Sequence, residues 1–118
     1  MQDIKKNIIV EKSVNFALQI IELAELLESK QKYVIANQLL KSGTSIGANV
    51  REAQNAESKA DFIHKMKIAA KEADETEYWL FLCQNSKKYP NCDSLQLEIQ
   101  EIIKILSKII SSSKTLNK

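Results

Sequence analysis

The side chains of this sequence that could carry out acid–base or metal chemistry lie just past its midpoint. Asp61 and His64 are three residues apart, and Glu72, Glu75 and Glu77 follow them. Metal sites in helical bundles use inward-facing Glu residues together with Glu-x-x-His pairs on facing helices. The chain has one histidine, and helical spacing places it away from the apolar face, near Asp61. We therefore interpret Asp61 and His64 as a solvated pair, and we predict no metal site and no cofactor.

The remaining nucleophilic groups lack the partners that catalysis requires. The sequence contains no Cys-x-x-Cys pair, no phosphate-binding glycine-rich loop and no nucleophile elbow. Ser42 and Ser45 have no base near them in the sequence, and the two cysteines, Cys83 and Cys92, are too few for a disulfide scaffold. Cys83 falls on an apolar helical face, which indicates a buried thiol. The sequence predicts no catalytic residues and a protein that is not an enzyme.

Glu77 is harder to assign, because the spacing places its carboxylate near the middle of an apolar helical face. An unpaired buried charge is costly. The alternatives are a buried polar network that fixes the helix register, a boundary residue that reaches solvent, and a metal-dependent catalytic site built around Glu75 and Glu77. We favour the first two. Asn49 and Glu52 are comparable polar residues close to an apolar stripe.

The elements that position these side chains are helices. A chain of 118 residues with two glycines and one proline disfavours a sheet-rich fold and is long enough for one domain, residues 1–118, with a single core. Asn7, Ser58 with Asp61, and Asp93 are predicted to cap helices. Short connections imply antiparallel neighbours, so the expected fold is all-α, an up-down-up-down four-helix bundle. The predicted helices span residues 8–29, 33–55, 59–86 and 94–112.

The second of these helices carries two parallel stripes. One stripe is apolar and ordinary for a core-facing helix: Ile35, Leu39, Gly43, Ile46, Val50 and Ala53. The other is small and polar: Gln38, Ser42, Ser45, Asn49, Glu52 and Ala56. Short side chains beside the core indicate close helix approach with hydrogen bonds made inward. The segment from Ser42 to Ser45 also has loop chemistry, but the stripes continue in phase across it, so we predict an unbroken helix.

Two helices carry more apolar surface than a monomeric bundle needs. In the first helix, Leu18 and Leu26 lie outside an already wide apolar arc. The third helix has a predicted core face of Phe62, Ile63, Met66, Ala69, Ala70, Ala73, Leu80, Phe81 and Cys83. Ile68, Trp79 and Leu82 fall on its opposite side, in one arc. Such a patch is typical of a protein–protein surface, and we predict that these three residues form the interface of a homo-oligomer.

The charges of the chain nearly cancel, with a formal net charge of +2. Basic and acidic residues are balanced on both sides of residue 60, and there is no charged tail, so the linear sequence shows no nucleic-acid footprint. No signal peptide and no long apolar run appear. We therefore expect a soluble, cytoplasmic protein without membrane contact.

The segment Ser45-Ile-Gly-Ala-Asn49-Val-Arg-Glu52-Ala53 resembles the Ser-Ile-x-x-Asn-hydrophobic-x-Glu motif of the four-helix-bundle proteins encoded in intervening sequences of 23S rRNA genes, also called the S23 ribosomal-type family. The resemblance covers nearly the whole chain and continues through residues 38–39, 58–62, 68–69 and 75–80. The sequence departs from the family at Ala53-Gln54, where many members have glycine, and residues 8–13 look like a subgroup pattern.

The resemblance implies a homopentamer with a central channel, and it implies structural or interface roles for the motif positions Ser45, Asn49, Glu52, Glu75 and Glu77. A related protein is the accessory protein of diversity-generating retroelements, which implies binding of RNA or DNA through a basic surface. Five copies would have to gather basic side chains such as Lys41, Arg51, Lys65, Lys67 and Lys71 onto one face. Arg51 points to the far side of its helix, so an acid that pairs with it is expected in another subunit. The alternative is an adaptor that binds a second protein without nucleic-acid contact.

Overall fold

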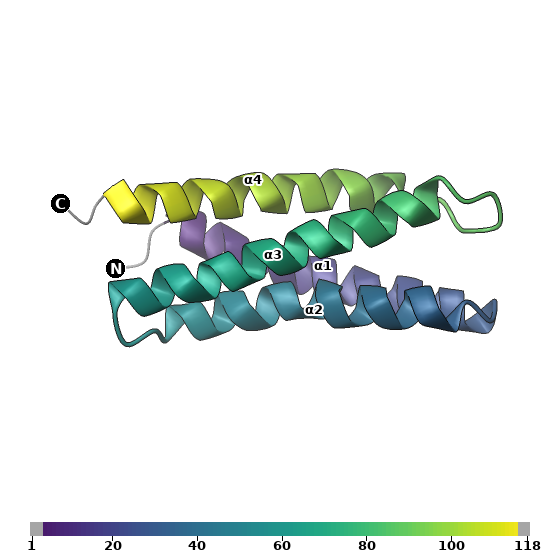
Figure 1. The fold of residues 1–118 in the computed structure, drawn as a ribbon, viewed down its shortest axis with the longest axis horizontal. Coiled ribbons are helices and arrows are strands. Elements are labelled where there is room, and N and C mark those ends of the chain that lie inside the picture. Colours follow the sequence, from purple (N-terminus) through teal and green to yellow (C-terminus); the bar gives the residue numbers. More distant parts are fainter. Residues whose placement is uncertain (1–3, 116–118) are drawn as a thin grey trace.

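The chain folds into four long antiparallel helices (Figure 1). The computed structural model describes the backbone of residues 4–115 and the side chains of residues 8–115. The helices are α1 (Ile4–Ser29), α2 (Tyr33–Gln54), α3 (Lys59–Gln84) and α4 (Asp93–Thr115). Each helix packs against two neighbours, in the order α1–α2–α3–α4 and back to α1, in a bundle of 51 × 20 × 19 Å. The predicted all-α up-down-up-down fold is confirmed.

The helix boundaries differ from the predicted ones mainly at two starts. Asn7 lies inside α1, which begins at Ile4, so Asn7 does not cap it. Asp93 is the first residue of α4, not its cap, and its carboxylate accepts hydrogen bonds from the side chains of Gln84 and Asn91. The second and third helices end one and two residues earlier than predicted, and α4 continues three residues further.

Local hydrogen bonds explain where α3 begins and α1 ends. The Ser58 hydroxyl accepts the Asp61 N–H at 3.0 Å, and the Asp61 carboxylate accepts the Glu57 N–H at 3.2 Å, which confirms the predicted N-terminal cap. After α1, Gln31 adopts a left-handed conformation with φ 65°. The Lys32 N–H then bonds to the Leu27 carbonyl at 2.9 Å, and the turn closes as a Schellman motif.

The core follows a repeat of alternating three- and four-residue steps, which is the knobs-into-holes pattern of left-handed bundles. In α3 the buried positions are Phe62, Met66, Ala69, Ala73, Thr76, Leu80 and Cys83. This line passes through Thr76 rather than Glu77, so Glu77 is only half-buried, at the α4 side of the helix. Phe81, predicted to lie in the core, is 53% exposed. The prediction left Thr76 out of the core because its side chain is polar, and it included Phe81 because its side chain is apolar. Both choices rotated the predicted core face of α3 away from the observed one.

The predicted unbroken second helix is confirmed, because α2 runs through both glycines. Gly43 is buried and faces Ile20 of α1. A Cβ atom there would lie 2.8 Å from Ile20 Cγ2 and 3.0 Å from Ile20 Cγ1. At Gly47 the nearest atoms to such a Cβ are 3.5 Å away, on Ser13. The packing of α1 against α2 therefore requires glycine at Gly43, whereas a Cβ atom would fit at Gly47.

None of the helices within the described residues is long and apolar enough to cross a membrane.

Candidate functional site

The small polar stripe of α2 faces α3, where it forms a buried contact between the two helices. Ser42 is 1% exposed and Thr76 is 0% exposed, and their hydroxyl oxygens are 2.9 Å apart. Each also contacts a carbonyl four residues back in its own helix: Ser42 contacts that of Gln38 at 2.9 Å and Thr76 that of Glu72 at 2.7 Å. The hydroxyl groups of Ser42 and Thr76 thus have two hydrogens for three hydrogen-bonding contacts. This pair fixes the register of α2 against α3, as the prediction of inward hydrogen bonds requires.

The motif residues of α2 make local contacts and one contact to α3. The Ser45 hydroxyl donates to the Lys41 carbonyl at 2.7 Å, and the Asn49 amide donates to the Ser45 carbonyl at 2.9 Å. Glu52 accepts from Lys65 Nζ at 3.0 Å across the seam between α2 and α3. The first two contacts lie within α2, and the third links α2 to α3. None of the three pairs a nucleophilic hydroxyl with a basic side chain.

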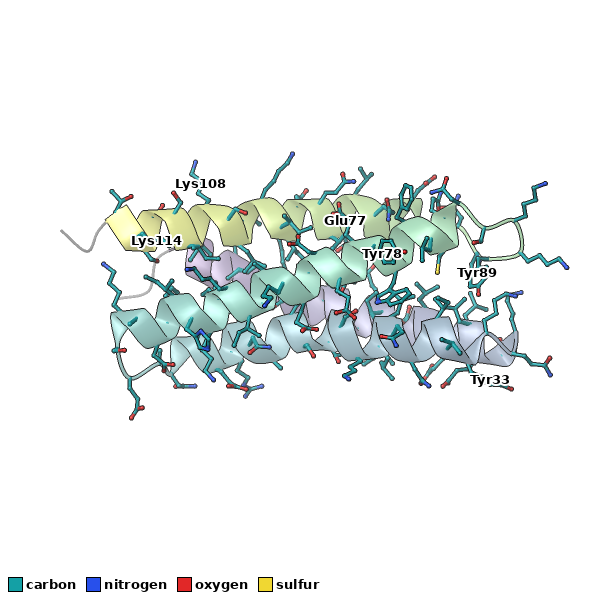
Figure 2. The ribbon with its side chains drawn as sticks, viewed as in Figure 1. Tyr33, Glu77, Tyr78, Tyr89, Lys108 and Lys114 are labelled. Atoms are coloured by element: carbon teal, nitrogen blue, oxygen red, sulfur yellow. The ribbon has the colours of Figure 1, made fainter. Side chains whose placement is uncertain are left out.

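The motif glutamates of α3 lie on opposite sides of that helix. Glu75 accepts the indole N–H of Trp79 at 3.2 Å. Glu77 lies between α3 and α4 (Figure 2), and its backbone carbonyl accepts the Gln96 amide at 3.4 Å. Burial and the neighbouring Glu75 raise the pKa of Glu72 above the ordinary carboxyl value. The three carboxylates therefore do not converge on one site.

The three residues predicted to form an outward patch are each half-buried. Trp79 packs against the hydrophobic core and meets Tyr78 edge to face, with ring centroids 5.4 Å apart. Because the α3 core line passes through Thr76, Ile68 and Trp79 lie towards α2 and not directly opposite the core. Ile68, Trp79 and Leu82 are thus less exposed than an outward patch would be, and their predicted role in an oligomer interface stays a prediction. The exposed apolar surface lies elsewhere, on α1 and at Tyr33, Val34, Tyr78, Phe81 and Leu97.

Among residues 8–115 no group of three or more His, Cys, Asp or Glu side chains is arranged to hold a metal ion. His64 is exposed, as predicted. Cys83 and Cys92 are buried free thiols at the corner between α3 and α4. A hydrogen bond between the two thiols, together with burial, raises the pKa of Cys83, and the same hydrogen bond lowers the pKa of Cys92.

A groove of about 580 Å³ runs between α1 and α2. Its walls are mostly small or apolar, and they include Val14 and Leu18, which are 51% and 56% exposed, and Gly47. Arg51 lies at its edge and makes no ion pair with a described residue. The excess apolar surface predicted for the first helix is confirmed, because Leu18 and Leu26, which were predicted to lie outside its apolar arc, are both exposed.

Charge is divided along the bundle axis in a way that the linear sequence hides. The half nearest the termini comprises residues 8–16, 44–71 and 104–115, with nine basic and four acidic side chains. The far half, residues 17–43 and 72–103, has five basic and ten acidic side chains. Antiparallel topology causes this, because segments distant in sequence lie at the same end (Figure 1).

The basic residues predicted to bind nucleic acid do not form one cluster in a single subunit. Lys65 is paired with Glu52, Arg51 faces the α1–α2 groove, and Lys41 lies in the acidic half. Lys67 and Lys71 are exposed. Sequence reasoning missed Lys104 and Lys108 on α4, which line a groove of about 190 Å³ beside α1 together with Ile8 and Ile105. Their four-residue spacing was the available signal.

The fold and these contacts define an all-α bundle protein whose two ends differ in charge. The family model of the 23S rRNA-intervening sequence proteins matches residues 5–108, so the chain belongs to that family. A solved structure of a protein of unknown function from the S23 ribosomal protein family of Bacteroides thetaiotaomicron VPI-5482 is 46% identical, with a TM-score of 0.87. The similarity covers 92% of this chain and 99% of the solved one. No curated protein matches the sequence.

Proposed function

We propose that this protein is a non-enzymatic scaffold that self-associates, as a pentameric ring, and binds RNA or DNA on a basic surface formed by the assembly. The observation that carries the proposal is the division of charge along the bundle. In a cyclic ring whose bundles run along the ring axis, every copy points the same way, so all basic halves share one rim and all acidic halves share the other.

Self-association is proposed to use the α1–α2 groove, with a second copy as its occupant. Val14, Leu18 and Ile21 repeat at four- and three-residue steps on the exposed side of α1, which is the pattern of a helix-packing seam. Gly47 and Ala48 on α2 are small residues, so the backbone of a helix from a second copy can approach closely. Arg51 would then pair with an acidic side chain of that copy. Light scattering at micromolar concentration tests this: the wild-type protein is expected to be oligomeric, and Leu18→Lys is expected to be monomeric with unchanged helix content. A monomeric wild-type protein would remove the ring from the proposal.

Nucleic-acid binding is tested by titrating a structured RNA and a DNA duplex at several salt concentrations. Binding through phosphates weakens steeply as salt rises. Lys104→Glu with Lys108→Glu is expected to weaken binding and to lower the salt slope by about two. The matched control is Lys87→Glu with Lys88→Glu, which makes the same charge change in the acidic half and should reduce binding much less. Equal losses in both pairs would refute a localised basic surface, and absence of binding at low salt would refute the nucleic-acid role.

A second candidate function is that of a protein-binding adaptor without nucleic-acid contact. The exposed Tyr78, Phe81 and Leu97 on the outer faces of α3 and α4 favour it. Recovery of one stoichiometric protein partner and no nucleic acid from cells would support the adaptor.

A further inference from the structure

The acidic half of the bundle contains a groove of about 290 Å³ between α3 and α4, separate from the α1–α2 groove and from Lys104 and Lys108. Its α3 wall presents two carboxylates and two aromatic rings, and its α4 wall presents two amides. The lining residues are Asp74, Glu77, Tyr78, Phe81, Gln96 and Gln100. Glu77 and Tyr78 are visible on α3 in Figure 2. No basic side chain lines the groove, so its charge is not neutralised locally.

The aromatic rings are exposed although they are large enough to belong in a core. Tyr78 is 56% exposed and Phe81 is 53% exposed. The Tyr78 ring packs edge to face on Trp79, which in turn donates its indole N–H to Glu75. These contacts orient the Tyr78 ring before any ligand arrives, and this reduces the entropy lost on binding.

The carboxylates lack partners of their own. Neither Asp74 nor Glu77 makes an ion pair within the part of the chain that the structure describes. Their surroundings are acidic as well, because the far half of the bundle carries ten acidic and five basic side chains. An anionic partner such as nucleic acid is therefore repelled here, whereas a cation is attracted.

From this combination we infer that the α3–α4 groove binds an arginine-bearing segment of a partner protein. A guanidinium group fits both features of the groove, because it pairs with carboxylates in a planar fork and stacks on aromatic faces. Apolar side chains beside the arginine would cover Phe81 and the neighbouring exposed Leu97. This inference deepens the adaptor candidate by naming the chemistry of its partner, and it is independent of nucleic-acid binding because it uses the opposite end of the bundle.

The test uses the full chain and a fluorescein-labelled peptide in which arginine alternates with leucine. Anisotropy is expected to show saturable, salt-sensitive binding, and NMR is expected to show shifts at the side chains of Tyr78, Phe81 and Gln100. Asp74→Asn with Glu77→Gln should weaken binding about fivefold or more. The matched control, Glu22→Gln with Glu25→Gln, removes two exposed carboxylates from α1 in the same half and should leave affinity within about twofold. Circular dichroism checks that every variant is folded.

Equal weakening by both pairs would overturn the inference, because it would show general attraction to an acidic surface. Unchanged affinity in the Asp74 and Glu77 variant would overturn it too, as would displacement of the peptide by a structured RNA. Lys104→Glu with Lys108→Glu separates this inference from the nucleic-acid role, since it should weaken RNA binding and leave peptide binding unchanged. Loss of peptide binding in that variant would count against a separate groove.

Discussion

Replacing the two glycines of α2 with alanine tests whether the α1–α2 contact is as tight as the structure indicates. Alanine is favoured over glycine in a helix interior by about 1 kcal/mol, and this gain is the same at both positions. At Gly47 the new methyl group meets only ordinary contacts at 3.5 Å. Gly47→Ala should therefore raise the free energy of unfolding by about 0.5–1 kcal/mol.

At Gly43 the same methyl group lies within 3.3 Å of three Ile20 atoms, including its Cβ. Rotation about χ1 cannot move that Cβ, and Ile20 is fully buried, so the helices must separate or bend. Overpacking of this kind costs about 1–3 kcal/mol. Because the helix-propensity gain cancels between the two variants, Gly43→Ala should be less stable than Gly47→Ala by about 1–3 kcal/mol.

Urea unfolding followed by circular dichroism measures both variants, and all samples need one protein concentration because self-association contributes to apparent stability. Ile20→Ala supplies the control, since it removes the two γ carbon atoms that approach most closely. In that background Gly43→Ala should no longer destabilise, which a double-mutant cycle would show directly. Equal stability of the two glycine variants in the wild-type background would refute the claim of a tight contact at Gly43.

Three further changes test the turn, the cap and one carboxylate. Gln31→Gly should raise the free energy of unfolding by about 0.5–1 kcal/mol, because glycine adopts the observed positive φ without a Cβ clash; a loss of stability in urea unfolding would contradict this. Ser58→Ala should cost about 1 kcal/mol by removing the acceptor for the Asp61 N–H, whereas Ser58→Asp should retain most of the stability. The pKa of Glu72 is raised in the folded protein, so its contribution favours folding below the ordinary carboxyl pKa and is lost as the pH rises through the folded value. Glu72→Gln should therefore be more stable than the wild-type protein at neutral pH, with the difference shrinking in acid; thermal melts across pH measure this, and a difference that grows in acid would contradict it.

The sequence predicted the elements of the fold well because the signals were local. Short polar turns, the Ser58 cap and the continuous stripes of α2 gave the four helices and the unbroken passage through Gly43. The face of α3 was harder to predict, because its apolar residues occupy more than one side. Thr76 lies in the core with its hydroxyl bonded to the Glu72 carbonyl and in contact with the Ser42 hydroxyl on α2, and the second contact cannot be predicted from the pattern of a single helix.

The candidate surfaces depended even more on tertiary structure. The excess apolar arc of α1 was visible in the sequence, whereas the partial burial of Ile68, Trp79 and Leu82 depends on how α3 is rotated in the bundle. Charge segregation escaped sequence analysis because a split at residue 60 cuts across the antiparallel helices. Each half of the sequence contributes residues to both the basic and the acidic end of the bundle, so basic and acidic residues nearly cancel within each half of the sequence.

The two thiols at the corner between α3 and α4 provide a built-in reporter of local motion. Cys83 and Cys92 are 1% and 2% exposed, and they are the only cysteines in the chain. The Gln84 side chain accepts the Cys92 N–H at 2.6 Å and ties the start of α4 to the end of α3. An alkylating reagent can reach either sulfur only after this corner opens, so the labelling rate in native buffer follows the opening equilibrium there. A partner that docks nearby would slow the labelling without any engineered probe.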